Sequence, residues 1–365
     1  MSAAQEPSRP RLAVLFGGRS SEHAISCVSA GSVLAALADG PWELQPIGIT
    51  KGGTFVLPEP DQAYAIVDGV LPEVRGGRPV VLVGDDAFRG YRLLDGDESV
   101  ALDVVFPVLH GPYGEDGTVQ GQLEMLGLPY VGSGVFASSA AMDKAHMKAM
   151  LRAAGMAVGP YAVLRGSADL ESAERERLGL PVFVKPARGG SSVGISKVDR
   201  WDDLPAALTL ARESDDKVVI EAAVPGREIE CGVLGAGGAE VSGPPEASLP
   251  AEIHLSPDFA FYDFEAKYLS DSTTFDVPAE LPAGVADEVR RQAVEAFRAL
   301  DCAGLARVDF FVQDDGTAIV NEVNTMPGFT PVSMFPRMWA ATGLEYPKLV
   351  RRLVELAVER GSGLS

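Results

Sequence analysis

The sequence is poor in cations, and this shortage excludes nucleic-acid-binding proteins. Its 31 Lys and Arg residues stand against 51 Asp and Glu residues, which gives a formal net charge of -20. A protein that binds nucleic acid needs clustered cations to displace counterions from the phosphates, and no stretch rich in Lys or Arg occurs here. We therefore expect no nucleic-acid partner, and any phosphate-binding site must be local.

Cysteine and long apolar runs are also scarce. The cysteines Cys27, Cys231 and Cys302 are odd in number and widely spaced in apolar segments, so we expect buried, reduced thiols rather than disulfides or a zinc site. The sequence nowhere supplies the roughly 20 consecutive apolar residues that span a bilayer. Pro7 and Pro10 stand where a signal peptide would need an apolar run. We therefore predict a cytoplasmic protein without a membrane partner.

What the sequence does contain is typical of a multidomain globular enzyme. A chain of 365 residues with 46% hydrophobic and 22% charged residues is too long for one ordinary core and fits two or three domains. The pattern predicts an open α/β domain over residues 1–136, a small α+β lobe over residues 137–224 and a C-terminal lobe over residues 225–365. No internal repeat or low-complexity tract is present.

Periodicity predicts the main elements of these domains. Residues 11–17 form an apolar run that ends at Gly17-Gly18, and apolar residues at helical spacing follow, so the chain begins with a strand, a turn and a helix. A single helix is expected from Ser138 to Ala154. Further elements are predicted as strands at 46–50, 80–83, 103–109 and 228–235, as helices at 119–126 and 283–300, and as strands in YAVL, PVFVKPA and KVVIEAAV.

The segment ARVDFFVQDDGTAIVNEVN predicts a β-hairpin with a cluster of polar side chains on one face. Asp315-Gly316 is a strong signal for a two-residue turn, in which Asp314 would pair with Thr317. Counting back from this turn places Asp309 opposite Glu322 and Arg307 opposite Asn324 on the same face, with Cβ atoms about 4.5–5.5 Å apart. Asp309, Glu322 and Asn324 would thus offer hard oxygen ligands that suit Mg²⁺ bridging phosphates.

An amphipathic hairpin with a solvated polar face is the alternative interpretation of the same alternation. It is weakened by the continuation into Thr325-Met326-Pro327-Gly328, a turning segment whose backbone N–H groups become available to an anion.

The segment PVFVKPARGGSSVGISKV predicts a second hairpin whose tip covers phosphate groups. It resembles a Walker A motif in its Gly spacing, but Ile195-Ser196 stands where Lys and Ser or Thr are required, and a strand follows instead of a helix. Gly at the tip allows close approach, and Ser191 and Ser192 can donate hydrogen bonds. Lys185 lies in an apolar strand, and burying an ammonium is costly unless an anion compensates it.

Two carboxylates bracket the end of a strand in EAAVPGRE. Glu221 and Glu228 are placed where a hinge between lobes would hold an adenosine, one on the exocyclic amine and one on the ribose hydroxyls. Judged on their spacing alone, these residues are surface carboxylates.

With these elements in order, the chain resembles the D-alanine:D-alanine ligase family of the ATP-grasp superfamily over nearly its full length. The resemblance is carried by the Lys144 region and by FGGRSSEHAIS, HGPYGEDGTVQG, VKPARGGSSVG, FYDFEAKYLSD, ARVDFF and NEVNTMPGFTPVS. It implies an ATP-grasp fold of a central and a C-terminal lobe, preceded by an open α/β domain, with ATP between the two lobes.

The resemblance also implies a role for each matching residue. Catalytic and substrate-binding roles fall on Glu22, Ser191, Tyr268, Arg307, Gly328, His110 and Ser333, with Glu115 as a supporting residue beside His110. Glu22 would hold the ammonium of the first D-alanine, and Ser333 the carboxylate of the second. Nucleotide contacts fall on Lys144, Lys185, Lys267, Glu221 and Glu228, and the metal ligands are Asp309, Glu322 and Asn324.

The activity that the resemblance implies is the ATP-dependent ligation of two D-alanines through an acyl phosphate, for peptidoglycan precursor synthesis. It implies ATP as a substrate, two Mg²⁺ ions with Mn²⁺ as a substitute, and a homodimer, and it leaves a monovalent cation open. The rival functions are a related ligase that takes D-lactate or D-serine as its second substrate and a nucleotide-binding regulator without turnover. The EAKY sequence disfavours a D-lactate enzyme, and the complete set of metal ligands with Arg307 disfavours a regulator. A Rossmann dehydrogenase is disfavoured because GGRSSE follows the first strand.

Overall fold

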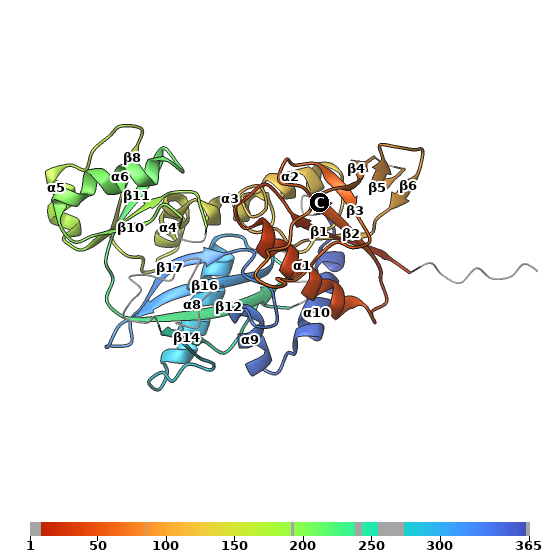
Figure 1. The fold of residues 1–365 in the computed structure, drawn as a ribbon. Coiled ribbons are helices and arrows are strands. Elements are labelled where there is room, and N and C mark those ends of the chain that lie inside the picture. Colours follow the sequence, from red (N-terminus) through yellow and green to blue (C-terminus); the bar gives the residue numbers. More distant parts are fainter. Residues whose placement is uncertain (1–8, 86, 191–192, 238–242, 255–273, 363–365) are drawn as a thin grey trace, which may run out of the picture.

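The computed structural model describes residues 9–85, 87–190, 193–237, 243–254 and 274–362. These residues form three β-sheets that follow one another along the chain. As Figure 1 shows, the central part of the chain lies at one end of the molecule, part of the N-terminal sheet lies at the other, and the C-terminal sheet lies below and between them. The predicted order of an α/β domain followed by two lobes is confirmed.

The N-terminal part is built on a seven-stranded sheet in the order β6-β5-β4-β3-β2-β1-β7. Its elements are β1 (Arg11–Gly17), α1 (His23–Leu37), β2 (Glu43–Ile49), β3 (Phe55–Pro58), β4 (Gly77–Gly84), β5 (Arg89–Leu93), β6 (Ser99–Ala101), β7 (Val104–Pro107) and α2 (Thr118–Met125). Strand β1 lies parallel to both β2 and β7 and is buried along almost its whole length, which explains its near-continuous apolar sequence.

The turn after β1 requires glycine. Gly17 has a φ of +88°, and a Cβ atom there would lie 2.4 Å from the carbonyl oxygen of Ile49. Only glycine takes up this conformation beside a neighbouring backbone without strain. The turn delivers Glu22 to the start of α1.

The central lobe is a four-stranded antiparallel sheet in the order β10-β9-β11-β8. Its elements are β8 (Tyr161–Arg165), α5 (Ser172–Leu178), β9 (Val182–Pro186), β10 (Ser196–Val198), α6 (Leu204–Arg212) and β11 (Lys217–Ala222). Strands β9 and β10 pair as the two arms of the predicted glycine-rich hairpin, and the strand that follows the loop confirms that this is not a Walker A motif.

The single helix predicted from Ser138 to Ala154 is two helices. They are α3 (Val135–Met142) and α4 (Lys144–Ala153), separated by Asp143 in an extended conformation with φ −89° and ψ 100°. The Asp143 carboxylate caps α4 by accepting hydrogen bonds from the backbone N–H groups of Ala145 and His146, both at 3.1 Å. The apolar periodicity continues through the break, which is why the spacing alone predicts one helix.

The C-terminal sheet has six strands among the described residues, and β12 and β16 lie at its centre. Its elements are β12 (Arg227–Gly235), β13 (Glu246–Ala247), β14 (Ala251–His254), β15 (Thr274–Asp276), α8 (Val285–Ala299), β16 (Gly304–Val312), β17 (Ala318–Asn324), α9 (Met334–Ala341) and α10 (Tyr346–Arg360).

Two of the apolar cores cross the predicted domain boundaries. One core joins β1, α1 and β7 of the N-terminal sheet to α9 and α10. A second contains Met147 and Leu151 of α4 together with β12, β16, β17 and α8. A third lies within the central lobe. Helix α4 therefore packs on the C-terminal sheet, and the boundaries at residues 136 and 224 stay a prediction.

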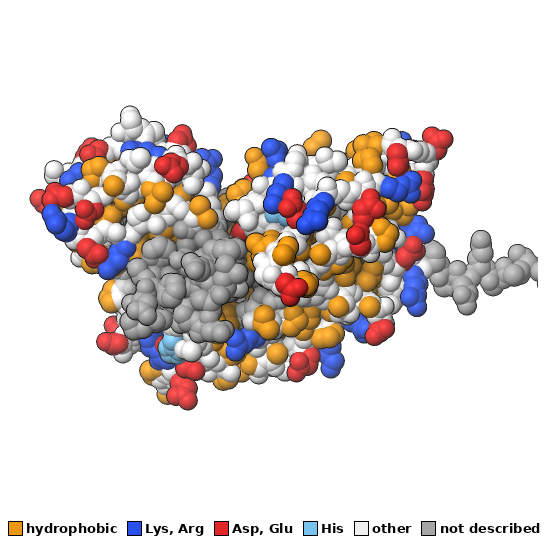
Figure 2. All heavy atoms as spheres, viewed as in Figure 1, with side chains coloured by type: hydrophobic (Ala, Val, Ile, Leu, Met, Phe, Trp, Pro, Cys, Tyr) orange, Lys and Arg blue, Asp and Glu red, His pale blue; other side chains and the backbone are white. Residues whose placement is uncertain are grey.

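The structure shows the state of the cysteines and the distribution of charge on one face of the surface. Cys27, Cys231 and Cys302 are buried and unbridged, as predicted, and burial raises the pKa of each thiol to about 12. On the face shown in Figure 2, acidic and basic side chains are interspersed. None of the described helices is long and apolar enough to cross a membrane.

Candidate active site

Two adjoining cavities lie beside the β16–β17 hairpin. The first encloses about 350 Å³ and is lined by β9, β11, β12 and the hairpin. The second encloses about 120 Å³ and is lined by the start of α1, the loop after β7, the Gly189-Gly190 loop and the residues after β17. Lys144, Arg307 and Glu322 line both cavities. The predicted polar face of the hairpin therefore borders both cavities.

The predicted register of the hairpin is confirmed at these polar residues. Asp309 lies opposite Glu322, and Arg307 lies opposite Asn324. The amide of Asn324 donates to Asp309 Oδ2 at 3.0 Å and to Glu322 Oε1 at 3.4 Å. The three predicted metal ligands thus converge in the structure.

The predicted turn is wrong, although the register is right. Gln313, not Asp314, pairs with Thr317: its N–H donates to the Thr317 carbonyl at 2.9 Å, so the loop has one residue more than predicted. A β-bulge compensates, because Asp309 pairs with Glu322 while Phe310 pairs with Val320, which leaves Asn321 as the extra residue of β17. The bulge restores the predicted pairing at the polar face.

Arg307 is held between two carboxylates. Its Nε and Nη2 donate to the two oxygens of Asp309, both at 2.7 Å, and its Nε lies 3.3 Å from Oε1 of Glu230. Glu230 is buried on β12 directly opposite Asp309. Burial acts to lower the pKa of Arg307, but Asp309 and Glu230 outweigh it and raise that pKa well above its ordinary value. Sequence reasoning missed Glu230, because its partner lies on a strand distant in sequence.

The donor set fits a hard divalent cation. The Asn324 amide lies within hydrogen-bonding distance of both carboxylates, and side-chain oxygens of this kind are the ligands that Mg²⁺ prefers. No thiol or imidazole belongs to this group of three. Asn324 would serve as a ligand through Oδ1, after its amide turns away from the carboxylates.

The first cavity holds a buried cluster of two lysines and one glutamate. Lys185 of β9 donates to Oε2 of Glu221 at 2.7 Å, and Lys148 of α4 lies 3.3 Å from Oε1 of the same carboxylate. Lys148 also donates to the carbonyl of the bulge residue Asn321 at 3.1 Å. Sequence reasoning missed Lys148, although its position four residues after Lys144 places both lysines on one face of α4.

The charges of this cluster shift its pKa values in different directions. Burial lowers the pKa of Lys148, and Glu221 offsets this only in part. Burial acts the same way on Lys185, but the attraction of Glu221 outweighs it and raises that pKa. For Glu221, burial is outweighed by Lys148 and Lys185, which bring its pKa to about 2. Two lysines face one carboxylate here, so this part of the cavity can place a cation beside an anionic ligand, while Glu228, Asp309 and Glu322 supply negative charge elsewhere on its lining.

The predicted adenosine contacts occupy the same cavity. Glu221 and Glu228 both line it, one at the end of β11 and the other near the start of β12. Both carboxylate oxygens of Glu221 are already engaged by lysines, so its first role in the described structure is as their counterion.

The second cavity brings together Glu22, His110, Glu115 and Gly328, to which the resemblance assigns substrate-binding and catalytic roles. Nδ1 of His110 lies 3.2 Å from the carbonyl oxygen of Met326, and its Nε2 lies 3.0 Å from Ser29 Oγ. The N–H of Gly111 donates to Glu115 Oε1 at 2.5 Å. The loop after β7 is therefore joined to the segment after β17.

The acidic groups of this cavity affect one another. Burial, together with the charge of Glu22, raises the pKa of Glu115 to about 8. Burial lowers the pKa of His110, and Glu22 opposes that shift. A Cβ atom at Gly190 would lie 3.1 Å from Oε2 of Glu22, so the glycine-rich loop passes directly over this carboxylate.

The remaining predicted residues are placed only in part. Ser333 stands at the N-cap position of α9 but makes no side-chain capping hydrogen bond, and its Oγ accepts a hydrogen bond from the Thr330 N–H at 3.1 Å. Ser191, Lys267 and Tyr268 lie outside the described residues.

Comparison with known proteins identifies the family. The family model described as the D-ala D-ala ligase N-terminus matches residues 11–133, and that described as the D-ala D-ala ligase C-terminus matches residues 150–355. The chain is 59% identical over 384 residues to the D-alanine–D-alanine ligase of Frankia casuarinae, with 98% of each chain covered. It is 54% identical over 369 residues to that of Mycolicibacterium vanbaalenii, with 98% of this chain and 99% of the relative covered.

Solved structures show the same likeness. The D-alanine-D-alanine ligase of Coxiella burnetii has a TM-score of 0.82 at 34% identity and covers 96% of this chain and 94% of its own. A D-Ala:D-Ser ligase of Enterococcus faecalis has a TM-score of 0.82 at 33% identity, with coverage of 96% and 100%. The D-alanine–D-alanine ligase of Bacillus anthracis, complexed with ATP, has a TM-score of 0.71 at 30% identity and covers 96% of this chain and 97% of its own. The chain therefore belongs to the D-alanine–D-alanine ligase family and has its ATP-grasp fold.

Proposed function

We propose that this protein is an ATP-dependent ligase that joins two molecules of D-alanine to D-alanyl-D-alanine and releases ADP and phosphate. The observation that carries the proposal is the hairpin face of Asp309, Glu322 and Asn324 beside Arg307, between two cavities, in a chain of this family. A dipeptide of this kind serves as a precursor of peptidoglycan.

The chemistry must overcome the poor electrophilicity of a carboxylate at neutral pH. A carboxylate oxygen of the first D-alanine attacks the γ-phosphorus of ATP, which gives an acyl phosphate and ADP. The amine of the second D-alanine then attacks the carbonyl carbon and expels phosphate. Lys144 and Lys185 line the first cavity, where their charge would balance the phosphates of ATP. Lys267 is proposed as a third such lysine.

The second cavity has groups for the amino acids. Glu22 would hold the ammonium of the first D-alanine, with His110 and Glu115 beside it. Arg307 and the N–H of Gly328 would stabilise the oxyanion of the tetrahedral intermediate. Ser191 and Tyr268 would complete the group around Glu22, and Ser333 would bind the second carboxylate. Exclusion of water matters here, because an exposed acyl phosphate would hydrolyse.

A divalent cation belongs to this scheme. Asp309, Glu322 and Asn324 would hold Mg²⁺, two ions in the full site with Mn²⁺ as a substitute, and the metal would supply charge neutralisation on the phosphoryl group. Glu221 and Glu228 would contact the adenosine. We further propose a cytoplasmic homodimer, and a monovalent cation stays open.

A second substrate other than D-alanine is the competing candidate. The Enterococcus faecalis structure is named a D-Ala:D-Ser ligase and has the same TM-score as that of Coxiella burnetii, so the fold does not separate the two acceptors. The relatives at 54% to 59% identity are named D-alanine–D-alanine ligases, which favours D-alanine.

Phosphate release from ATP tests the proposal. It should be measured with D-alanine, L-alanine, D-lactate and D-serine, each alone and in pairs. We expect release with D-alanine alone and no increase on adding D-lactate or D-serine. Release that requires D-serine or D-lactate would point to the competing candidate, and release independent of every amino acid would refute the ligase.

A further inference from the structure

Helix α4 belongs to two lobes at once. Its residues Met147 and Leu151 are buried in the core of the C-terminal sheet. Its N-terminus is bonded to the central lobe, where the N–H of Lys144 donates to the carbonyl of Ala187 at 2.9 Å. The helix therefore connects the lobe that carries the metal-ligand face with the lobe that carries the glycine-rich loop.

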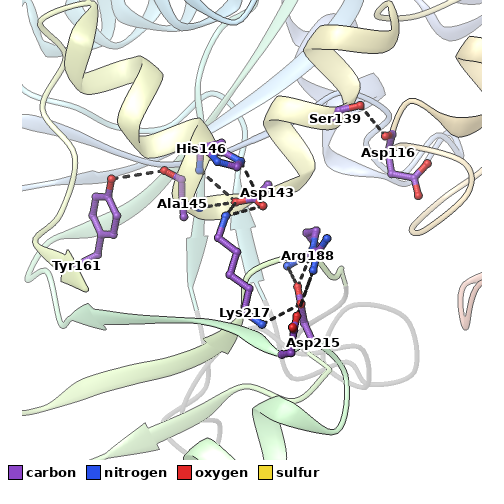
Figure 3. Close-up of polar contacts among 10 residues, drawn as sticks. Asp116, Ser139, Asp143, Ala145, His146, Tyr161, Arg188, Asp215 and Lys217 are labelled. Atoms are coloured by element: carbon purple, nitrogen blue, oxygen red, sulfur yellow. Dashed lines mark hydrogen bonds and ion pairs between the residues drawn. The ribbon is translucent and has the colours of Figure 1, made fainter. Parts of the chain in front are cut away.

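A buried ion pair makes this connection. Nζ of Lys217, the first residue of β11, lies 2.6 and 2.7 Å from the two carboxylate oxygens of Asp143. Lys217 is 2% exposed and Asp143 is 6% exposed. Figure 3 shows the lysine reaching from its strand to the start of α4. Burying two charges is costly, so the pair is maintained only where its geometry is well satisfied.

A second ion pair holds the start of the glycine-rich loop. The guanidinium of Arg188 donates to both oxygens of Asp215 at 2.9 and 2.6 Å, and the backbone N–H of Arg188 donates to the same carboxylate at 3.0 Å. Asp215 also accepts from the backbone N–H of Lys217 at 3.0 Å. Figure 3 shows this pair next to the Asp143–Lys217 pair. The two pairs thus meet at the start of β11.

The groups that these pairs fix are the ones that face phosphate in the proposed function. Lys144 directly follows Asp143, and its Nζ donates to the carbonyl of Gly189 at 2.8 Å. Gly189 directly follows Arg188 and lines the second cavity with Gly190.

We propose that Asp143 and Lys217, assisted by Arg188 and Asp215, are positioning residues for the phosphate groups of ATP, because they hold Lys144 and the glycine-rich loop as one unit. The inference rests on the proposed use of ATP.

The choice of an ion pair over apolar contact has a physical reason. The apolar cluster between α4 and the central sheet is small: it consists of Ala145, Ala187 and Val219, with Tyr161 packed against it. Apolar contacts are non-directional, whereas two short charged hydrogen bonds fix the direction of approach. The Asp143–Lys217 ion pair therefore affects the direction of the Lys144 side chain as well as the stability of the central lobe.

Three variants separate positioning from stability. Asp143→Asn keeps an N-cap acceptor for α4 but removes the charge that Lys217 faces. Lys217→Met leaves Asp143 buried without its cation. The double variant removes both charges, which typically restores much of the stability lost by breaking one side of a buried pair. Dissociation constants for Mg·ADP and for a non-hydrolysable ATP analogue should be measured by calorimetry, together with melting temperatures, ATP KM and kcat.

We expect each single variant to weaken nucleotide binding and raise ATP KM by about tenfold to a hundredfold, since a small displacement far from the chemistry suffices for losses of this size. The double variant should regain melting temperature but not nucleotide affinity. Affinity that returns together with stability would show a purely structural pair, and wild-type affinity in the single variants would overturn the proposal outright.

Arg188→Met keeps the test decisive if the buried variants fail to fold. The Arg188 side chain is 56% exposed, and without it Asp215 keeps the backbone N–H groups of Arg188 and Lys217 as donors, so the melting temperature should fall less than in Lys217→Met while nucleotide affinity falls. The matched control is Arg200→Met, an exposed arginine of the same lobe paired with Asp202. Equal affinity in the two variants contradicts the proposal. Failure of the ligase assignment would differ, because the wild type would then form no dipeptide whatever the variants bind.

Discussion

At the scale of single residues, Glu115 is a carboxylate of the second cavity whose pKa lies far above its ordinary value. Burial raises its pKa to about 8 from an ordinary 4.5, with Glu22 adding to the shift. Between these two values the folded protein holds a proton that the unfolded chain has lost. The contribution of Glu115 to stability is therefore complete below about pH 4.5 and is lost as the pH rises through 8.

Glu115→Gln should remove this pH dependence. The uncharged amide can still accept the hydrogen bond from Gly111. From pH 5 to 8, the unfolding free energy of the wild type should fall relative to that of the variant by up to about 1.4 kcal/mol per pH unit. Denaturant unfolding of both proteins across this range provides the measurement, and parallel curves would show that Glu115 is ionised in the folded state.

Lys148 belongs to none of the motifs that predict the ATP site, yet its position suggests that it contributes to ATP binding. It lies 3.3 Å from Glu221 and donates to the carbonyl of Asn321, so it borders the first cavity from α4. Lys148→Met should raise ATP KM about tenfold to a hundredfold, since hydrogen bonds with charged groups contribute about 1.5–3 kcal/mol. The exposed Lys348→Met is the control. An ATP KM equal in both variants would reduce Lys148 to a structural role.

Glu322 carries the metal-ligand prediction. Glu322→Gln keeps the size of the side chain and the pairing with Asp309 but removes a charge from the predicted Mg²⁺ site. Turnover should be lost while the melting temperature stays close to that of the wild type. Turnover and melting temperature of the wild type and the variant should be measured at several Mg²⁺ concentrations. Turnover of the variant equal to that of the wild type at low Mg²⁺ would exclude Glu322 as a ligand.

At the scale of elements, the hairpin shows both the reach and the limit of sequence reasoning. Alternation and the Asp315-Gly316 signal correctly place Asp309 opposite Glu322, yet the turn is one residue longer than predicted, and the bulge at Asn321 cancels the error. No local pattern indicates a bulge, because its extra residue is stabilised by a partner distant in sequence, Lys148.

Deletion of Asn321 tests the function of the bulge. The pairs on either side, Asp309 with Glu322 and Phe310 with Val320, would then follow in regular order, so the metal-ligand face should survive. Lys148 would lose its carbonyl acceptor. We expect an unchanged Mg²⁺ dependence and a raised ATP KM. A changed Mg²⁺ dependence in a folded protein would show that the bulge itself sets the metal-ligand face.

The break between α3 and α4, like the bulge in the hairpin, involves a contact with a residue distant in sequence. Apolar periodicity runs through Asp143, and Lys217, which pairs with the Asp143 carboxylate at the break, lies 74 positions away. Residues in motifs that are contiguous in sequence, including Glu22, His110, Glu115 and the hairpin residues, could thus be singled out and do line the two cavities, and their roles stay predictions. Lys148, Glu230 and Lys217 could not, because their partners lie on elements distant in sequence.

At the scale of the whole molecule, the three sheets bring motifs from distant parts of the sequence around two cavities. The N-terminal sheet supplies Glu22 and the loop after β7, the central lobe supplies Lys185 and the glycine-rich loop, and the C-terminal sheet supplies the hairpin. Such an arrangement suits a reaction in which ATP and two amino acids must meet away from water.

The transfer of oxygen from D-alanine to phosphate tests the proposed reaction through an acyl phosphate most directly. The protein should be incubated with ATP, Mg²⁺ and D-alanine that carries ¹⁸O in both carboxylate oxygens, and the products analysed by mass spectrometry. The proposed reaction should give D-alanyl-D-alanine together with phosphate that contains one ¹⁸O atom, because the carboxylate oxygen that attacks the γ-phosphorus leaves with the phosphate. Unlabelled phosphate, or labelled phosphate without the dipeptide, would contradict it.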